Sequence, residues 1–267
     1  MALHDVKKNY QMLFSTKLYP TLAVVIFLLV QVLVGALLSI FHSGGFVSAL
    51  WISGATTLAA LSCLRLFKWR QAFSIRAIDW SAGIVGIVAA IFGAAAFDIA
   101  EEMLNLPDNM NETFISIQSS FAGVLYISTI GPVVEEVVFR ECLLGHLLRR
   151  GTNRWVAIIA SSLVFGIIHF NPVQMFFATA IGIILSIIYY KSGNIVLTSV
   201  IHILNNSAAM VQMRVLGDDA ADFRLTEWLG GITTSVLCAV VAMAVCITLL
   251  RLFWNTYNKT KKYETVY

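Results

Sequence analysis

Charged residues are scarce in this sequence. Asp, Glu, Lys and Arg make up 12% of the 267 residues, and hydrophobic residues make up 58%. Soluble domains carry about twice that charged fraction. The apolar residues gather in runs long enough for membrane-spanning helices, which need roughly 20 such residues each. The composition therefore excludes an ordinary soluble enzyme and indicates a membrane protein.

Several familiar signatures are also missing. The sequence has no long polar stretch for a second domain, no internal repeat, no CxxC pair and no HExxH zinc motif. No serine or cysteine with a matched base stands among the polar residues of the apolar runs. The cysteines all lie within those runs and are expected to pack as small apolar residues: Cys63, Cys142, Cys238 and Cys246.

Eight apolar runs predict an all-α fold, a polytopic membrane helical bundle of about eight transmembrane helices. They cover residues 20–41, 46–67, 80–104, 119–148, 155–170, 173–190, 195–213 and 228–254. We expect one transmembrane domain over residues 1–267, with a catalytic core at about 119–213. The fifth and sixth runs are short, and we expect them to be tilted or partly sunk in the bundle. The first run has spanning length and no cleavage site, so it should remain as a helix.

The basic residues predict the orientation of these helices. With a cytosolic N-terminus and eight spans, 15 of the 18 fall on the cytosolic side, while Arg214 and Arg224 fall outside and Arg140 falls within the membrane. The positive-inside rule therefore places both termini in the cytosol. Topology and anionic lipid explain the basic clusters, so we expect no nucleic-acid partner. Short loops and the lack of a targeting tail favour a prokaryotic plasma membrane.

Polar residues inside three of the runs are the candidates for function, because an ionisable side chain at membrane depth is costly unless it is paired or wetted. The first group is Glu135, Glu136 and Arg140. Glu136 and Arg140 are one helical turn apart and predict an ion pair. Glu135 points about 100° away from Glu136, which leaves it as the candidate general base. The alternative is a buried salt bridge that only fixes helix packing.

The other two groups have the same one-turn spacing. His169 follows Phe165 by four residues, and Phe165 is placed to wall a pocket beside the imidazole. His202 precedes Asn206 by four residues, and N–H donors from both suit a developing oxyanion. Taken singly, each histidine or asparagine is equally well explained by interhelical hydrogen bonding.

Depth connects the three groups. At about 1.5 Å per residue, Glu135, His169 and His202 lie roughly 21, 22 and 17 Å from the basic ends of their helices. Because independent packing residues need not agree in this way, we expect a shared, water-filled cavity.

The expected chemistry is hydrolysis by an activated water. A carboxylate and a histidine can hold and deprotonate a water that attacks a peptide carbonyl, with His202 and Asn206 stabilising the oxyanion. We expect no cofactor. Zinc held by Glu135, His169 and His202 is the alternative, although Arg140 and Asn206 are poor neighbours for a cation.

The order Glu-Glu-x-x-x-Arg, Phe-x-x-x-His, His-x-x-x-Asn on successive helices resembles the CPBP (CAAX protease and bacteriocin-processing, Abi) intramembrane proteases. That family includes the CAAX prenyl endopeptidase. The similarity runs from about Ser120 to Met210, and the flanking helices are similar only in being apolar.

The resemblance implies a glutamate-type endopeptidase. Glu135 and His169 would activate the water, His202 and Asn206 would form the oxyanion hole, and three residues would support the site: Glu136, Arg140 and Phe165. One position departs from the family pattern, because Glu141 stands where many relatives carry a small residue. It adds a third carboxylate whose helix face the sequence does not define.

The substrate implied is a membrane-associated peptide or a lipidated protein, as in CAAX-like processing or maturation of a bacteriocin or pheromone peptide. Two other classes of function remain open. One is a non-catalytic membrane partner, such as a bacteriocin immunity protein or a regulator of a sensor kinase. The other is a proton-coupled transporter, although no pair of broken helices in corresponding halves supports it.

Overall fold

The computed structural model describes residues 19–40, 45–75, 78–217 and 223–257, and within these ranges the regular structure is helical throughout. The long helices are α2 (Tyr19–Ile40), α3 (Phe46–Cys63), α5 (Trp80–Leu104), α10 (Arg154–Ile167), α11 (Pro172–Ser192), α12 (Ile195–Leu216) and α14 (Ile232–Thr256). Three short helices connect them: α4 (Trp69–Ala72), α6 (Asn111–Gln118) and α13 (Leu225–Trp228).

The helix that carries the two glutamates is built from five consecutive segments. They are α7 (Phe121–Leu125), η2 (Tyr126–Ile130), α8 (Gly131–Glu135), η3 (Glu136–Leu144) and α9 (Gly145–Arg149), where η2 and η3 are π-helical. A π segment has a wider turn than an α-helix and is frequent at functional sites. Every residue of η3 is buried. The side chains of this helix are therefore aimed by a turn that an α-helical reading of the sequence does not anticipate.

Seven of the described helices, counting residues 121–149 as one, are long and apolar enough to cross a membrane. The protein is thus an integral, multi-pass membrane protein, as predicted. The run expected at 155–170 differs, because α10 has only 14 residues and ends at Ile167. The run expected at 173–190 is longer than predicted and forms a helix of 21 residues. Helix α6 lies between two of the predicted apolar runs, and α13 lies almost entirely between two others.

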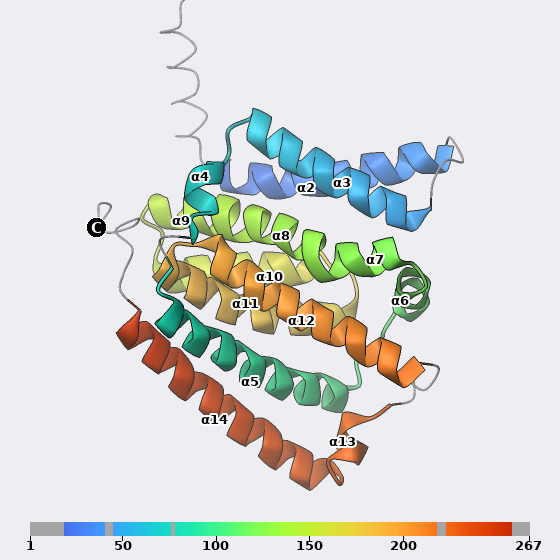
Figure 1. The fold of residues 1–267 in the computed structure, drawn as a ribbon, viewed down its shortest axis with the longest axis vertical. Coiled ribbons are helices and arrows are strands. Elements are labelled where there is room, and N and C mark those ends of the chain that lie inside the picture. Colours follow the sequence, from blue (N-terminus) through green and yellow to red (C-terminus); the bar gives the residue numbers. More distant parts are fainter. Residues whose placement is uncertain (1–18, 41–44, 76–77, 218–222, 258–267) are drawn as a thin grey trace, which may run out of the picture.

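The helices form a layered bundle (Figure 1). The α2–α3 hairpin lies on one side, helices α7 to α12 form the middle, and α5 with α14 lies on the other side. Two apolar cores hold these layers together. One joins α2 and η3 to α10 and α11, and the second joins α5, α12 and α14 to α11. Helix α11 therefore contributes to both cores and fixes the middle layer.

Basic residues at the ends of two helices meet around a tryptophan at the end of a third. The Arg154 guanidinium lies 5.6 Å from the ring centre of Trp254, and the Lys191 ammonium lies 5.4 Å from it. This arrangement brings the start of α10 and the ends of α11 and α14 to one face of the bundle. Several of the basic residues behind the predicted orientation lie outside the described residues: Lys7, Lys8, Lys17, Arg76, Lys259, Lys261 and Lys262. The cytosolic placement of the termini stays a prediction.

Candidate active site

The three sequence groups come from adjacent helices of the middle layer. Glu135 ends α8, Glu136 and Arg140 belong to η3, Phe165 lies near the end of α10, and His202 lies in α12. Helix α12 packs against α8 and η3, and α10 packs against η3. Residues up to 67 positions apart in the sequence are therefore neighbours in space.

The predicted ion pair is present at the centre of the site. The Arg140 Nη1 and Glu136 Oε1 atoms are 3.2 Å apart, and the two side chains are 1% and 0% exposed. The Arg140 guanidinium also lies 4.4 Å above the ring of Phe165 and donates a long hydrogen bond of 3.5 Å to the Gly182 carbonyl. A charge this deeply buried is stable only while its partner is present. The pair therefore has a structural role, whatever else it does.

His202 lies between the two glutamates. Its Nδ1 atom is 3.1 Å from Glu136 Oε1, and its Nε2 atom is 3.6 Å from Glu135 Oε2. The first distance is a hydrogen bond, and the second is too long for one. Glu136 thus orients the imidazole, and the other ring nitrogen is turned toward Glu135.

Phe165 contacts both imidazoles. Its ring centre is 5.1 Å from that of His169 and 5.8 Å from that of His202, and both contacts are edge to face with interplanar angles of 89°. Phe165 itself is 1% exposed. The side chain therefore forms a fixed wall between the two histidines, which is the position that the sequence suggested for it.

The tautomer of His169 follows from one contact. Its Nδ1 atom lies 2.8 Å from the Phe165 carbonyl oxygen, one turn earlier in the helix. A carbonyl oxygen only accepts, so Nδ1 carries the hydrogen and Nε2 keeps its lone pair when the ring is neutral. In the described part of the chain, no hydrogen bond or ion pair joins His169 to Glu135. The half-buried His169 ring has an acceptor nitrogen available for a water.

Asn206 is held from a different side. Its amide nitrogen donates to the Ile127 carbonyl at 3.1 Å, and its amide oxygen accepts from Asn205 at 3.4 Å. Ile127 belongs to the π-helical segment η2. The amide group has two N–H donors, so one remains for another acceptor.

Burial divides the site into an inner and an outer part. Glu136, Arg140 and Phe165 are sealed, whereas the Glu135 side chain keeps 22% of its exposure. His169 and Asn206 are likewise only half-buried. Three of the groups expected to touch a substrate are thus partly accessible, whereas the fourth, His202, is buried together with the supporting residues.

The sequence did not define the direction of Glu141. In the structure its side chain contacts Tyr189 and Arg149, the last residue of α9. Its carboxylate accepts a hydrogen bond of 2.7 Å from the Tyr189 hydroxyl and lies 3.6 Å from Arg149. The Arg149 guanidinium also donates to the Glu141 carbonyl oxygen at 3.2 Å. This third carboxylate joins η3 to α9 and α11.

A metal would need several ligands close together. Among the residues that the structure describes, no three His, Cys, Asp or Glu side chains lie close enough to hold one ion. Glu135 and His202 are neighbours, but the cationic guanidinium of Arg140 shares their surroundings. The side chains as placed do not fit a zinc site.

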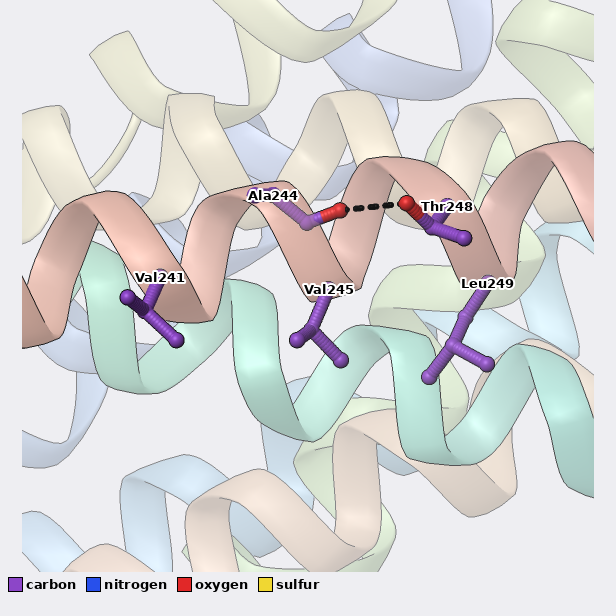
Figure 2. A pocket seen from close by; sticks show the side chains of 5 residues that line it. All are labelled: Val241, Ala244, Val245, Thr248 and Leu249. Carbon is purple, nitrogen blue, oxygen red and sulfur yellow. Dashed lines mark hydrogen bonds between the residues drawn. The ribbon is translucent and has the colours of Figure 1, made fainter.

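A shallow depression elsewhere on the surface is apolar. Val241, Ala244, Val245, Thr248 and Leu249 of α14 line it, and the Thr248 hydroxyl donates to the Ala244 carbonyl (Figure 2). Its lining has no titratable group, and α14 lies at the edge of the bundle (Figure 1). None of its lining residues belongs to the site of the glutamates.

Sequence reasoning missed the backbone contacts of the site. The carbonyl groups of Ile127 and Gly182 hold Asn206 and Arg140, and a Cβ atom at Gly182 would lie 3.2 Å from the Phe165 ring and 3.5 Å from Arg140. Any residue can supply a backbone carbonyl, so no sequence motif predicts these contacts. The available signal was Gly182, a glycine within an apolar run, which can indicate a close approach of another group to the backbone.

Comparison with known proteins places the motifs in one family. Residues 117–208 match the family model for "Type II CAAX prenyl endopeptidase Rce1-like" proteins. "Putative membrane peptidase YdiL" of Bacillus subtilis (strain 168) is 28% identical over 95 residues, which are 36% of this chain and 38% of that protein. "Membrane-embedded CAAX protease MroQ" of Staphylococcus aureus (strain USA300) is 33% identical over 96 residues, which are 33% of this chain and 38% of that protein.

Each alignment thus spans well under half of the relative, and no solved structure matches the chain. Both relatives are bacterial, in agreement with the expected prokaryotic host. The matched segment contains all three motifs, from Glu135 to Asn206. The resemblance to the CPBP family, the relatives of the CAAX prenyl endopeptidase, which the motifs led us to expect, is therefore confirmed over residues 117–208 of this membrane protein.

Proposed function

We propose that the protein is an intramembrane endopeptidase of the glutamate type. The observation that carries the proposal is the placement of His202 between Glu135 and Glu136, with one glutamate sealed by Arg140 and the other still accessible. A purely structural ion pair needs only the first glutamate. The second is left for chemistry, beside an imidazole whose orientation is already set.

In the proposed reaction, Glu135 and the Nε2 atom of His169 hold a water. Glu135 takes a proton from it, and the resulting hydroxide attacks the carbonyl carbon of the scissile peptide bond. The carbonyl oxygen becomes an oxyanion that accepts hydrogen bonds from His202 and from the second N–H of Asn206. When the C–N bond breaks, Glu135 returns the proton to the leaving amine. Water is consumed and two peptide ends are formed, so protons and charges balance.

The sealed residues prepare this site. The hydrogen bond from His202 to Glu136 leaves the far ring nitrogen directed at the space beside Glu135. An imidazolium form, with two N–H groups, can satisfy Glu136 and an oxyanion at the same time. Phe165 restricts both histidine rings by direct contact, so little reorganisation is needed on substrate binding.

The proposed substrate is a peptide or lipidated protein tail that reaches the site through the bilayer or along its surface. Two observations support it: Glu135, His202 and Asn206 lie within membrane-length helices, and one relative is named a CAAX protease. CAAX-like processing and maturation of a bacteriocin-type or pheromone-type peptide are both consistent with such a site. A membrane-protein partner is the corresponding proposal if the chain does not cleave peptides.

The test is cleavage of a peptide panel by the purified protein in detergent. The panel contains a quenched farnesylated peptide with a C-terminal CAAX sequence and short apolar leader peptides. We expect wild-type protein to cleave at least one of them, Glu135→Gln to cleave none, and activity to survive a strong chelator. Loss of activity on chelation, restored by zinc, would support the metal alternative. Unchanged cleavage by Glu135→Gln would remove Glu135 from the mechanism.

A further inference from the structure

Tyr126 is a buried polar residue that the proposed mechanism does not use. It is 4% exposed and begins the π segment η2, in the same helix as Glu135. Its ring packs against Trp51 of α3, with 5.6 Å between ring centres. Within the described residues, the Tyr126 hydroxyl forms no hydrogen bond. A buried tyrosine usually places its hydroxyl against a partner, so this one calls for an explanation.

Two glycines make the space that the ring occupies. A Cβ atom at Gly54 of α3 would lie 2.6 Å from the Tyr126 hydroxyl, which is closer than real contacts allow. A Cβ atom at Gly131 would lie 3.2 Å from the opposite edge of the ring. The phenol therefore reaches across from its own helix to the backbone of α3. It is held there by close packing and not by a hydrogen bond.

The Tyr126 ring and the Glu135 carboxylate belong to the same helix, about two turns apart. Tyr126, Gly131 and Glu135 follow one another at spacings of five and four residues, which are one π turn and one α turn of the same helix. They share one face, and Gly131 has no side chain to fill the space between the phenol and the carboxylate.

The hydroxyl is also reachable. Among the described residues, the Tyr126 hydroxyl has no hydrogen-bond partner, and its oxygen is not completely buried. The small exposure of Tyr126 therefore includes its hydroxyl.

We infer that Tyr126 is a further substrate-binding residue, whose hydroxyl donates a hydrogen bond to a carbonyl oxygen of the peptide held beside Glu135. This inference rests on the proposed function. It explains why a hydroxyl without a partner is kept in an apolar contact with Trp51 and two glycines. The ligand class is a peptide backbone carbonyl, which accepts and does not donate.

Tyr126→Phe tests the inference because it removes the hydroxyl and keeps the ring. The probe is the quenched farnesylated peptide, with Tyr190→Phe as the matched control, since Tyr190 stacks on Trp254 at the basic face of the bundle. We expect Tyr126→Phe to lower kcat/KM about tenfold or more. Its melting temperature should equal or exceed that of the wild type, because no hydrogen bond of the fold is lost. Tyr190→Phe should leave both quantities unchanged.

A second variant approaches the hydroxyl from the other side. Gly54→Ala pushes the phenol out of place, so we expect a similar fall in kcat/KM, and little further fall when it is combined with Tyr126→Phe. Gly35→Ala is its control, because a Cβ atom at Gly35 has no neighbour within 4 Å.

The outcomes separate this inference from the proposed function. Full kcat/KM in Tyr126→Phe, with no activity in Glu135→Gln, would overturn the role of Tyr126 alone. A lower melting temperature in Tyr126→Phe would also overturn it, because the hydroxyl would then be shown to hold the fold. Full activity in Glu135→Gln would instead remove the proposed function itself.

Discussion

The Nδ1 atom of His202 lies 3.1 Å from Oε1 of Glu136, the oxygen that also faces Arg140. One carboxylate oxygen therefore joins the motif on α12 to the motif on η3. This contact makes the orientation of the imidazole dependent on a residue that no substrate is expected to reach.

Removal of the charge on Glu136 should destabilise the fold. In Glu136→Gln, the Arg140 guanidinium stays buried without its counter-ion, so we expect the free energy of unfolding to fall by about 3–5 kcal/mol. Thermal or denaturant unfolding in a fixed detergent measures this change. Glu227→Gln, at an exposed position on α13, is the control and should change the free energy of unfolding by less than about 0.5 kcal/mol. Equal stability of the two variants would mean that the ion pair contributes nothing to the fold.

Replacement of the groups assigned to the chemistry should abolish cleavage and leave the fold intact. We expect Glu135→Ala, His169→Ala and His202→Ala each to abolish peptide cleavage while the protein remains folded in detergent. Glu135 and His169 are only partly buried, so their loss leaves little cavity. Cleavage rates and size-exclusion profiles of the purified variants measure the two properties. A variant that elutes as folded protein and cleaves at the wild-type rate would contradict the role assigned to that residue.

Asn206 should affect the rate less completely. Its amide supplies one of two proposed oxyanion donors, so we expect Asn206→Ala to lower kcat by about 10²–10³. Single-turnover measurements with saturating peptide separate this effect from binding. Asn205→Ala is the adjacent control, because Asn205 contacts the site only through a hydrogen bond of 3.4 Å to Asn206. If both variants lost the same small factor, Asn206 would be a packing residue.

A fourth expectation concerns the turn that follows His169. Phe170 has a positive φ of 52°, and Asn171 is 1% exposed. The Asn171 amide donates to Asp108 at 3.0 Å and accepts from the Asn109 backbone at 3.1 Å, and it does not cap its own helix. Asn171→Ala should therefore cost about 1–3 kcal/mol of stability.

Hydrogen exchange can localise that loss. In Asn171→Ala, amides of residues 105–110 should exchange faster, whereas those of α11 beyond its first turn should not. A double-mutant cycle with Asp108→Ala measures the coupling between the two side chains. Additive effects of the two substitutions would show that the contact carries no energy of its own.

Much of the helical architecture could be predicted from the sequence because it follows from the length of each apolar run. The helix predicted at 80–104 has those bounds in the structure, and Glu136 and Arg140 form the expected pair. Such features depend on residues that are close in the sequence. Their geometry is set by the helix itself.

The rest depends on contacts between distant segments, which spacing does not reveal. The partner of Glu141 is Tyr189, which is 48 residues away, and the partner of Asn206 is the backbone of Ile127. The π-helical turns of η2 and η3 change which side chains share a face, and they have no residue signature. The end of α10 at Ile167 also escaped prediction, because apolar residues continue past it into the turn at Phe170.

The position of α11 in both apolar cores has a mechanical consequence. His169 follows α10, which packs on one side of α11, and His202 belongs to α12, which packs on the other side. The separation of the two imidazoles is therefore set by how tightly three helices are pressed together in the plane of the membrane. We expect lateral pressure from the surrounding lipid to act on that same spacing. The thickness and tension of the bilayer are thus expected to tune the activity of this site directly, without any ligand.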